Sequence, residues 1–239
     1  MLTKLIYYRQ IIGVLVAISR HSSGEKQLND VIEGGFPRGS VIAYVGNSGT
    51  NKRISGMRFI HEGYLANSGT LIVTTTLLVS KYHDLAKRVG VDVTKSIFID
   101  AANWKVQRID RSQISPSPYH VSNLTDLNAL LAIIVQACTD NEVDRILFDS
   151  PSSLLIYSTP SSEQVFRFFE LLTAFTRNKK ITLVYLLEDD VHSLEVKSTL
   201  LFLSDGEIKF RYEPGNGKTQ VLPVSLWFTD IATSWIELD

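Results

Sequence analysis

One segment of the chain has nearly the residue types and spacing of a phosphate-binding loop. Such loops read G-x-x-x-x-G-K-[ST]: backbone amides surround the phosphates, the lysine reaches their oxygens, and the hydroxyl holds magnesium. The chain keeps Lys52, but Asn51 replaces the second glycine and Arg53 replaces the hydroxyl residue. The segment consists of Gly46, Asn47, Ser48, Gly49, Thr50, Asn51, Lys52 and Arg53. The pattern predicts a degenerate nucleotide-binding loop.

A carboxylate stands where it could meet this loop. The short apolar run 145–149 ends in Asp149. Ligand sites of open parallel sheets lie at the carboxyl ends of the strands, so Asp149 is expected near the loop. A permanent cation where a divalent ion belongs opposes metal binding. We therefore predict that Arg53 and Asp149 form an ion pair in place of a metal; the alternative is that Asp149 keeps a metal role without the hydroxyl residue.

Strands and helices alternate around these residues. The β-branched run 41–45 is typical of a buried strand, and a helix with Ile54, Met57, Ile60 and Tyr64 on one face follows the loop. Further strands are expected at 71–75, 96–100, 145–149 and 181–187. Further helices are expected at 80–89, at 125–138 with Thr125 as its cap, and around 165–175, and a long loop at 101–119.

After residue 206 the alternation of strands and helices ends, and only strand-like segments follow. The segments 207–212 and 219–226 resemble a β-hairpin, and 235–238 a last strand. The order of elements predicts an α/β fold with a mostly parallel central sheet, helices on both faces and a C-terminal antiparallel β extension.

Length and composition favour one globular domain. The 239 residues suit one α/β domain at 28–239, preceded by an N-terminal apolar segment at 1–27. The net charge of −1 argues against a protein that coats nucleic acid by positive charge alone. The single cysteine, Cys138, can form neither an intrachain disulfide nor a zinc site, so a reducing cytoplasm is the expected compartment.

The apolar run 11–18 is about half as long as a membrane span, and Arg9 and Gln10 interrupt the stretch before it. We expect a helix or strand that packs on a neighbouring subunit or on the chain's own core, and no membrane span.

Two segments carry a resemblance to a known family. Residues 28–40 read LNDVIEGGFPRGS and are similar to the lead-in of the KaiC-like branch of the RecA superfamily, and 204–208 resemble its A-D-G-V-I turn. The likeness covers residues 28–238. It implies a RecA-like P-loop fold in which Asp149 is the Walker-B-like residue that holds the metal's water shell.

The chain departs from this family where hydrolysis is concerned. The family's second strand ends in two glutamates, one of which activates water, whereas Thr76 and Leu77 stand here. Neither can act as a base at neutral pH. The family's Lys-Met-Arg segment, which reaches a neighbour's γ-phosphate, is replaced by 225–227, Ser-Leu-Trp. We therefore expect no catalytic residue, no metal and no enzyme activity.

The resemblance implies three functions. The first is a non-catalytic paralogue that docks on an active RecA/KaiC relative or another protein as an accessory factor, as in archaeal RadA-dependent DNA recombination and repair. The second is a sensor that binds ATP or ADP without turnover, as in archaellum-motor accessory proteins. The third is an active ATPase with a shifted site. Lys52 either grips a phosphate or is a solvated residue, and the sequence leaves both open. A homo-oligomer is also left open.

Nucleic acid is expected to bind weakly or not at all. A basic loop with Trp104, Lys105, Arg108 and Arg111 could contact a single strand, but a solvated loop is favoured. The acidic run 188–190 repels phosphate where RecA relatives place a DNA-contacting loop.

Overall fold

The computed structural model describes residues 18–103, 117–121, 123–156, 160–229 and 234–239. A nine-stranded sheet forms its centre, in the order β11-β10-β9-β3-β8-β7-β4-β5-β6. All pairings from β9 to β6 are parallel, and β10 and β11 are added antiparallel at one edge. The strands are β3 (Val41–Gly46), β4 (Gly69–Thr74), β5 (Ile97–Asp100), β6 (Tyr119–His120), β7 (Val143–Asp149), β8 (Thr182–Glu188), β9 (Gly206–Glu213), β10 (Lys218–Val224) and β11 (Ile236–Glu237).

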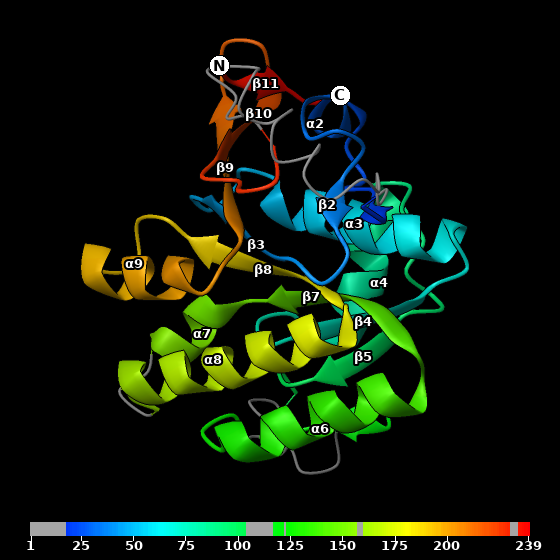
Figure 1. Ribbon diagram of the computed structural model, residues 1–239, viewed down its shortest axis with the longest axis vertical. Helices are drawn as coiled ribbons and strands as arrows, with labels where there is room; N and C mark the ends of the chain where they lie inside the picture. The colour runs from blue at the N-terminus through cyan, green and yellow to red at the C-terminus, as the bar shows by residue number, and fades with distance from the viewer. Residues whose placement is uncertain (1–17, 104–116, 122, 157–159, 230–233) are drawn as a thin grey trace, which may run out of the picture.

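Helices cover both faces of the sheet (Figure 1). One core lies between the sheet and α6 (Leu127–Asp140), α7 (Pro151–Leu155), α8 (Ser162–Lys179) and α9 (Leu194–Phe202). The other lies under α2 (Lys26–Val31), α3 (Lys52–Leu65) and α4 (Val79–Arg88). The predicted fold class is confirmed.

Burial explains the two kinds of strand pattern. Every residue of β3 is buried, and so are the first six of β8, because helices cover both faces of these central strands. In β9 and β10 buried residues alternate with more exposed ones over most of their length, as in strands that have only one covered face. The antiparallel extension is thus the less enclosed edge of the sheet.

The start of α6 differs from the prediction. Asp126, not Thr125, is the N-cap, and its side chain accepts a hydrogen bond from the backbone N–H of Ala129. Thr125 instead donates its own N–H and hydroxyl to Asn123. The reason is that Asn123 closes a turn which already uses the threonine, leaving the aspartate free to cap the helix.

Several short elements were not predicted. The helix α7 begins at Pro151, with Ser150 between it and Asp149, and α9 follows the acidic run, with Ser193 as its cap. The strand β6 pairs with β5 at the end of the expected loop 101–119. The basic side chains predicted within that loop, at 104–111, lie outside the described residues.

Near the N-terminus, β1 (Arg20–His21) pairs with β2 (Phe36–Pro37), and α2 begins at Lys26. Residues 1–17, and with them most of the apolar segment expected to pack on a core or a subunit, lie outside the described residues. Among the described helices, none combines the length and apolar character that a membrane crossing requires.

Candidate functional site

The degenerate loop lies between β3 and α3. Gly46 ends β3, where a Cβ atom would lie 2.6 Å from the carbonyl oxygen of Phe210 on β9, so only glycine permits this approach. Asn51 precedes α3 in the left-handed conformation, with φ 62° and ψ 10°. Asparagine tolerates this conformation better than most residues, and the turn expected from the sequence does form. The Asn51 amide donates to the hydroxyl of Thr219 on β10, at 2.9 Å.

Arg53 and Asp149 form the predicted ion pair. Nε of Arg53 lies 2.5 Å from Oδ2 of Asp149, and Nη2 lies 3.1 Å from Oδ1. The Asp149 side chain is 1% exposed and that of Arg53 is 33% exposed. Two parallel contacts between a guanidinium and a carboxylate are the strong, orientation-specific form of this interaction.

Two neighbouring hydroxyls complete the environment of the carboxylate. Tyr82 of α4 donates to Oδ2 of Asp149 at 3.0 Å. Thr76 accepts from Nη2 of Arg53 at 3.1 Å and donates to Oδ1 at 3.4 Å. Thr76 thus lies at the site, as its position after β4 predicts, whereas Tyr82 was missed. Its helical spacing with Val79 and Ala86 indicates the buried face of α4, but not that this face meets Asp149.

Burial and the charge of Asp149 keep Arg53 and Tyr82 protonated. Burial lowers the pKa of Arg53, but the charge and hydrogen bonds of Asp149 outweigh that effect, and the pKa is raised overall. Burial, and then the charge of Asp149, raise the pKa of Tyr82 well above its usual value. Arg53 therefore stays cationic and Tyr82 stays a donor at physiological pH.

Lys52 is buried, so the alternative that it is a solvated residue is wrong. Its side chain is 7% exposed, and Nζ lies 3.0 Å from the Asn47 carbonyl oxygen and 2.9 Å from Oε2 of Glu188. Glu188 was not recognised as its partner, although it ends β8 in register with Gly46 of the adjacent β3. The rule that ligand sites lie at strand ends could have identified it.

A pocket of about 250 Å³ lies over the loop. Its lining includes Asp149 and Glu188, two apolar side chains, Leu85 and Leu186, and the loop and first helical turn at 48–54. Of the described residues that line it, the two cations each face one carboxylate. The four charges therefore cancel as two neighbouring pairs.

Leu77, Leu226 and Trp227, which stand at functional positions of the family, do not line this pocket. Leu77 packs against the core on the α3 side, and its carbonyl accepts from the Thr74 hydroxyl. In the segment after β10, Leu226 is buried and Trp227 is exposed. No group of three or more potential metal ligands occurs in the part of the chain that the structure describes.

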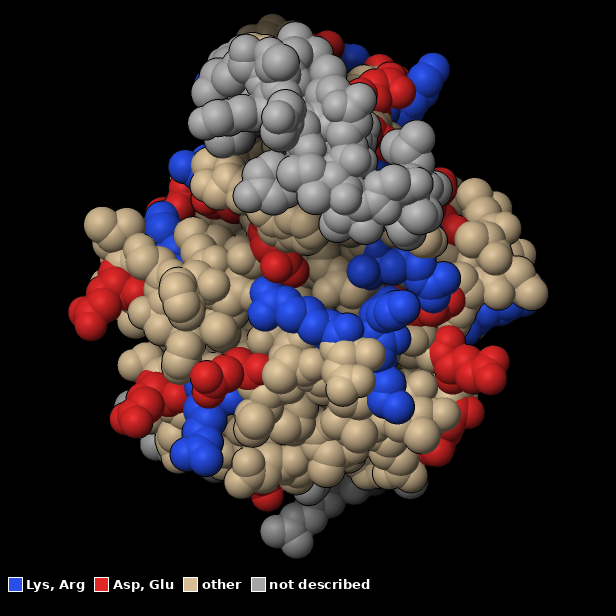
Figure 2. Space-filling model, viewed as in Figure 1, with Lys and Arg blue, Asp and Glu red and all other residues tan. Residues whose placement is uncertain are grey.

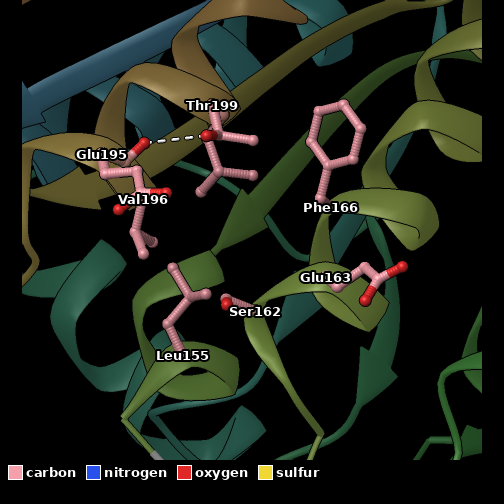
Figure 3. A pocket seen from close by; sticks show the side chains of 8 residues that line it. Leu155, Ser162, Glu163, Phe166, Glu195, Val196 and Thr199 are labelled. Atoms are coloured by element: carbon pink, nitrogen blue, oxygen red, sulfur yellow. Dashed lines mark hydrogen bonds between the residues drawn. The ribbon is translucent and has the colours of Figure 1, made fainter.

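A second pocket, of about 310 Å³, lies between α7, α8 and α9. Figure 3 shows Glu195, Val196 and Thr199 of α9 on one side, and Leu155 and the side chains that begin α8 on the other. Close to it on α9 are the largely exposed side chains of Leu194 and Phe202, at 75% and 82%. No sequence motif pointed to this region.

The parallel sheet with a phosphate-loop-like turn between β3 and α3 defines a RecA-like P-loop domain. The family model described as ATPase: KaiC matches residues 21–222. The chain therefore belongs to the KaiC-like ATPase family, and the resemblance read from residues 28–40 and 204–208 is confirmed.

Three similar proteins fit this assignment. The circadian clock oscillator protein KaiC of Parathermosynechococcus lividus is 26% identical over 220 residues, which cover 85% of this chain and 37% of that protein. A UPF0273 protein of Methanopyrus kandleri is 26% identical over 152 residues, 59% of this chain and 57% of the relative. The chain thus spans between about a third and somewhat over half of these curated relatives. The crystal structure of a KaiC-like protein from Pyrococcus horikoshii has the same fold, with a TM-score of 0.72, 16% identity, and coverage of 92% of this chain and 94% of that one.

Proposed function

We propose that this chain is a non-hydrolysing member of the KaiC-like family that acts as an accessory or regulatory partner of another protein. The observation that carries the proposal is the guanidinium of Arg53 on the carboxylate of Asp149. P-loop enzymes need a Ser/Thr hydroxyl and an acidic side chain to hold magnesium between the phosphates. Here the hydroxyl residue is an arginine, and that arginine occupies both oxygens of the acid.

Thr76 and Leu77, which stand where the family has its two glutamates, supply no general base. Thr76 is hydrogen-bonded within the ion pair, and a threonine hydroxyl is too weakly basic to activate water at neutral pH. Leu77 packs into the core. These features support the loss of the family's general base at these two positions.

The apolar surface of α9 supports a protein as the partner. An exposed helix normally has a polar outer face. On α9, Leu194 and Phe202 occupy that outer face, one helical stripe with Ser198 between them. Exposed apolar surface of this kind typically marks an interaction site. We propose an active relative of the same family as the partner, and a place in archaeal DNA recombination and repair, as the family resemblance of the sequence implies.

Charge supports a protein rather than nucleic acid. On the face shown in Figure 2, a group of basic side chains lies near the centre, and acidic side chains lie on both sides of it. Proteins that track a nucleic acid present a more continuous basic stripe. Glu188 and Asp189, next to the loop at the end of β8, are paired with Lys52 and Lys197, so these two cations are already occupied and are not free to contact a phosphate backbone.

A nucleotide sensor is the second candidate, and the pocket over the loop favours it. The pocket keeps about 250 Å³ of space and a buried lysine at its floor. Such a loop can hold phosphates without cleaving them. Calorimetric titration with ATP in metal-free buffer separates the two candidates, because only the sensor gives a saturable signal.

Phosphate release from ATP tests the first proposal. The protein is incubated with ATP and magnesium, with and without single-stranded DNA, beside the Lys52→Ala variant. We expect the wild-type protein, the variant and the buffer to release phosphate at the same rate. Release by the wild-type protein that Lys52→Ala abolishes would contradict the proposal.

A further inference from the structure

The lysine of the loop already has an anionic ligand. Nζ of Lys52 lies 2.9 Å from the Glu188 carboxylate, and the remaining contact of the ammonium is the Asn47 carbonyl within the loop itself. A lysine ammonium is a compact point charge that binds one anionic oxygen much as it binds another. The carboxylate oxygen therefore stands in the place where a phosphate oxygen would meet this lysine.

The second cation of the pocket is not free either. Arg53 is bound through two nitrogens to Asp149. Lys52 and Arg53 are the basic side chains in the described lining of the pocket. An entering phosphate thus meets two cations that already have anionic partners. It also meets the negative carboxylate of Glu188, whose side chain is 25% exposed. Like charges at close range disfavour binding.

The main chain of Glu188 is held by hydrogen bonds, whereas its carboxylate is held by Lys52. Its N–H donates to the Ser152 hydroxyl at 3.0 Å, and the next N–H, that of Asp189, donates to the Gly46 carbonyl at 3.3 Å. The carboxylate Oε2 lies 2.9 Å from the ammonium of Lys52 and accepts no further hydrogen bond from the residues that the structure describes. Rotation about the side-chain bonds can therefore release the carboxylate once another anion takes its place on Lys52.

From this arrangement we infer that Glu188 decides whether the pocket takes a phosphate group. Its carboxylate is an internal ligand of Lys52, and a phosphate-bearing anion, such as pyrophosphate or the polyphosphate of a nucleotide, binds only by displacing it. The inference rests on the proposed role of the loop as a phosphate site and names the residue that restricts its ligand. Hydrolysis plays no part in it.

Binding of inorganic pyrophosphate in buffer with a chelator tests this inference, because neither metal nor ATP is present. Titration calorimetry compares the wild-type protein with Glu188→Gln, which keeps the shape of the side chain and removes its charge. We expect the variant to bind roughly ten- to a hundredfold more tightly, since a hydrogen bond to a charged group is gained without its competitor. Glu188→Ala repeats the measurement without an amide oxygen to contact Lys52.

Two controls make the result specific. Asp190→Asn removes the same charge two residues away at an exposed position, and we expect affinity close to that of the wild-type protein. The double variant Glu188→Gln/Lys52→Ala should lose the gain. Melting curves confirm that each variant is folded.

Three results would overturn the inference: equal affinity of the wild-type protein and both Glu188 variants, no binding by any of them, or an equal gain from Asp190→Asn. Each is independent of whether ATP is hydrolysed, so failure here is distinguishable from failure of the proposed function.

Discussion

The loop site and the surface of α9 differ in whether their side chains have partners within the chain. At the loop, Lys52 and Arg53 are paired with Glu188 and Asp149, and Asp149 is almost fully buried. At α9, large apolar side chains face solvent. The carboxylates of Glu163 and Glu195, which line the adjoining pocket, form no ion pair with any described residue.

Under the proposed function, the loop shows where the family binds its ligand and α9 shows where this chain binds its partner. The region that carries the family motif has turned its charges toward one another, and an incoming ion or phosphate must break a pair to bind. The region without a motif leaves surface uncovered that a protein partner could bury. A motif thus indicates where a site lay in the family, and unsatisfied groups indicate where binding remains favourable.

A large loss of stability is expected when the Arg53–Asp149 pair is broken. Arg53→Ser leaves the Asp149 carboxylate buried without a cation. Removing one partner of a buried pair costs about 3–5 kcal/mol, and partial exposure of Arg53 places the cost toward the lower end of that range. Chemical denaturation in metal-free buffer measures the free energy of unfolding.

Arg38→Ser is the matched control for this change. Arg38 pairs with Asp144, and both side chains are about one-third exposed. A pair near the surface contributes about 0–1 kcal/mol. Equal losses of stability in the two variants, or no loss in Arg53→Ser, would show that Arg53 merely blocks the site. The loop site would then not be stabilised by its ion pair.

Substitutions at the exposed apolar residues of α9, with a buried residue as the control, test whether this surface lacks a partner within the chain. Leu200 is the buried residue of this helix, and Leu200→Ala should cost about 2–5 kcal/mol through the cavity it leaves. Leu194→Ser and Phe202→Ser should each change the free energy of unfolding by less than about 0.5 kcal/mol, because both side chains face solvent. Denaturant titrations of the dilute proteins decide it: a large loss from Leu194→Ser or Phe202→Ser would mean that these residues already have a partner.

Much of the fold could be predicted because its signals are local. The buried run at 41–45 and the glycines of 34–39 place a strand and a lead-in on sequence alone. The ion pair followed from one general rule, since strand ends of a parallel sheet meet at one edge and place Arg53 beside Asp149.

The features that could not be predicted depend on how elements pack in the folded chain, which the sequence pattern does not indicate. Apolar and polar residues of α9 are interleaved around the helix, so no amphipathic period distinguishes it from a loop or a strand. The burial of Lys52 results from β8 lying next to β3, which is a matter of strand order. The capping residue of α6 was assigned one position early because Thr125 and Asp126 are both good caps, and only the turn at Asn123 decides between them.

Metal binding tests most directly the claim that Arg53 has replaced the ion. Manganese, which reports on magnesium sites by electron paramagnetic resonance, is titrated in the presence of ATP into the wild-type protein, Arg53→Ser and Arg53→Ser/Asp149→Asn, at a temperature where all three are folded. We expect no protein-bound manganese signal from the wild-type protein, affinity gained by at least on the order of tenfold in Arg53→Ser, and loss of that gain in the double variant. Manganese bound by the wild-type protein as tightly as by Arg53→Ser, and lost on Asp149→Asn, would contradict the account.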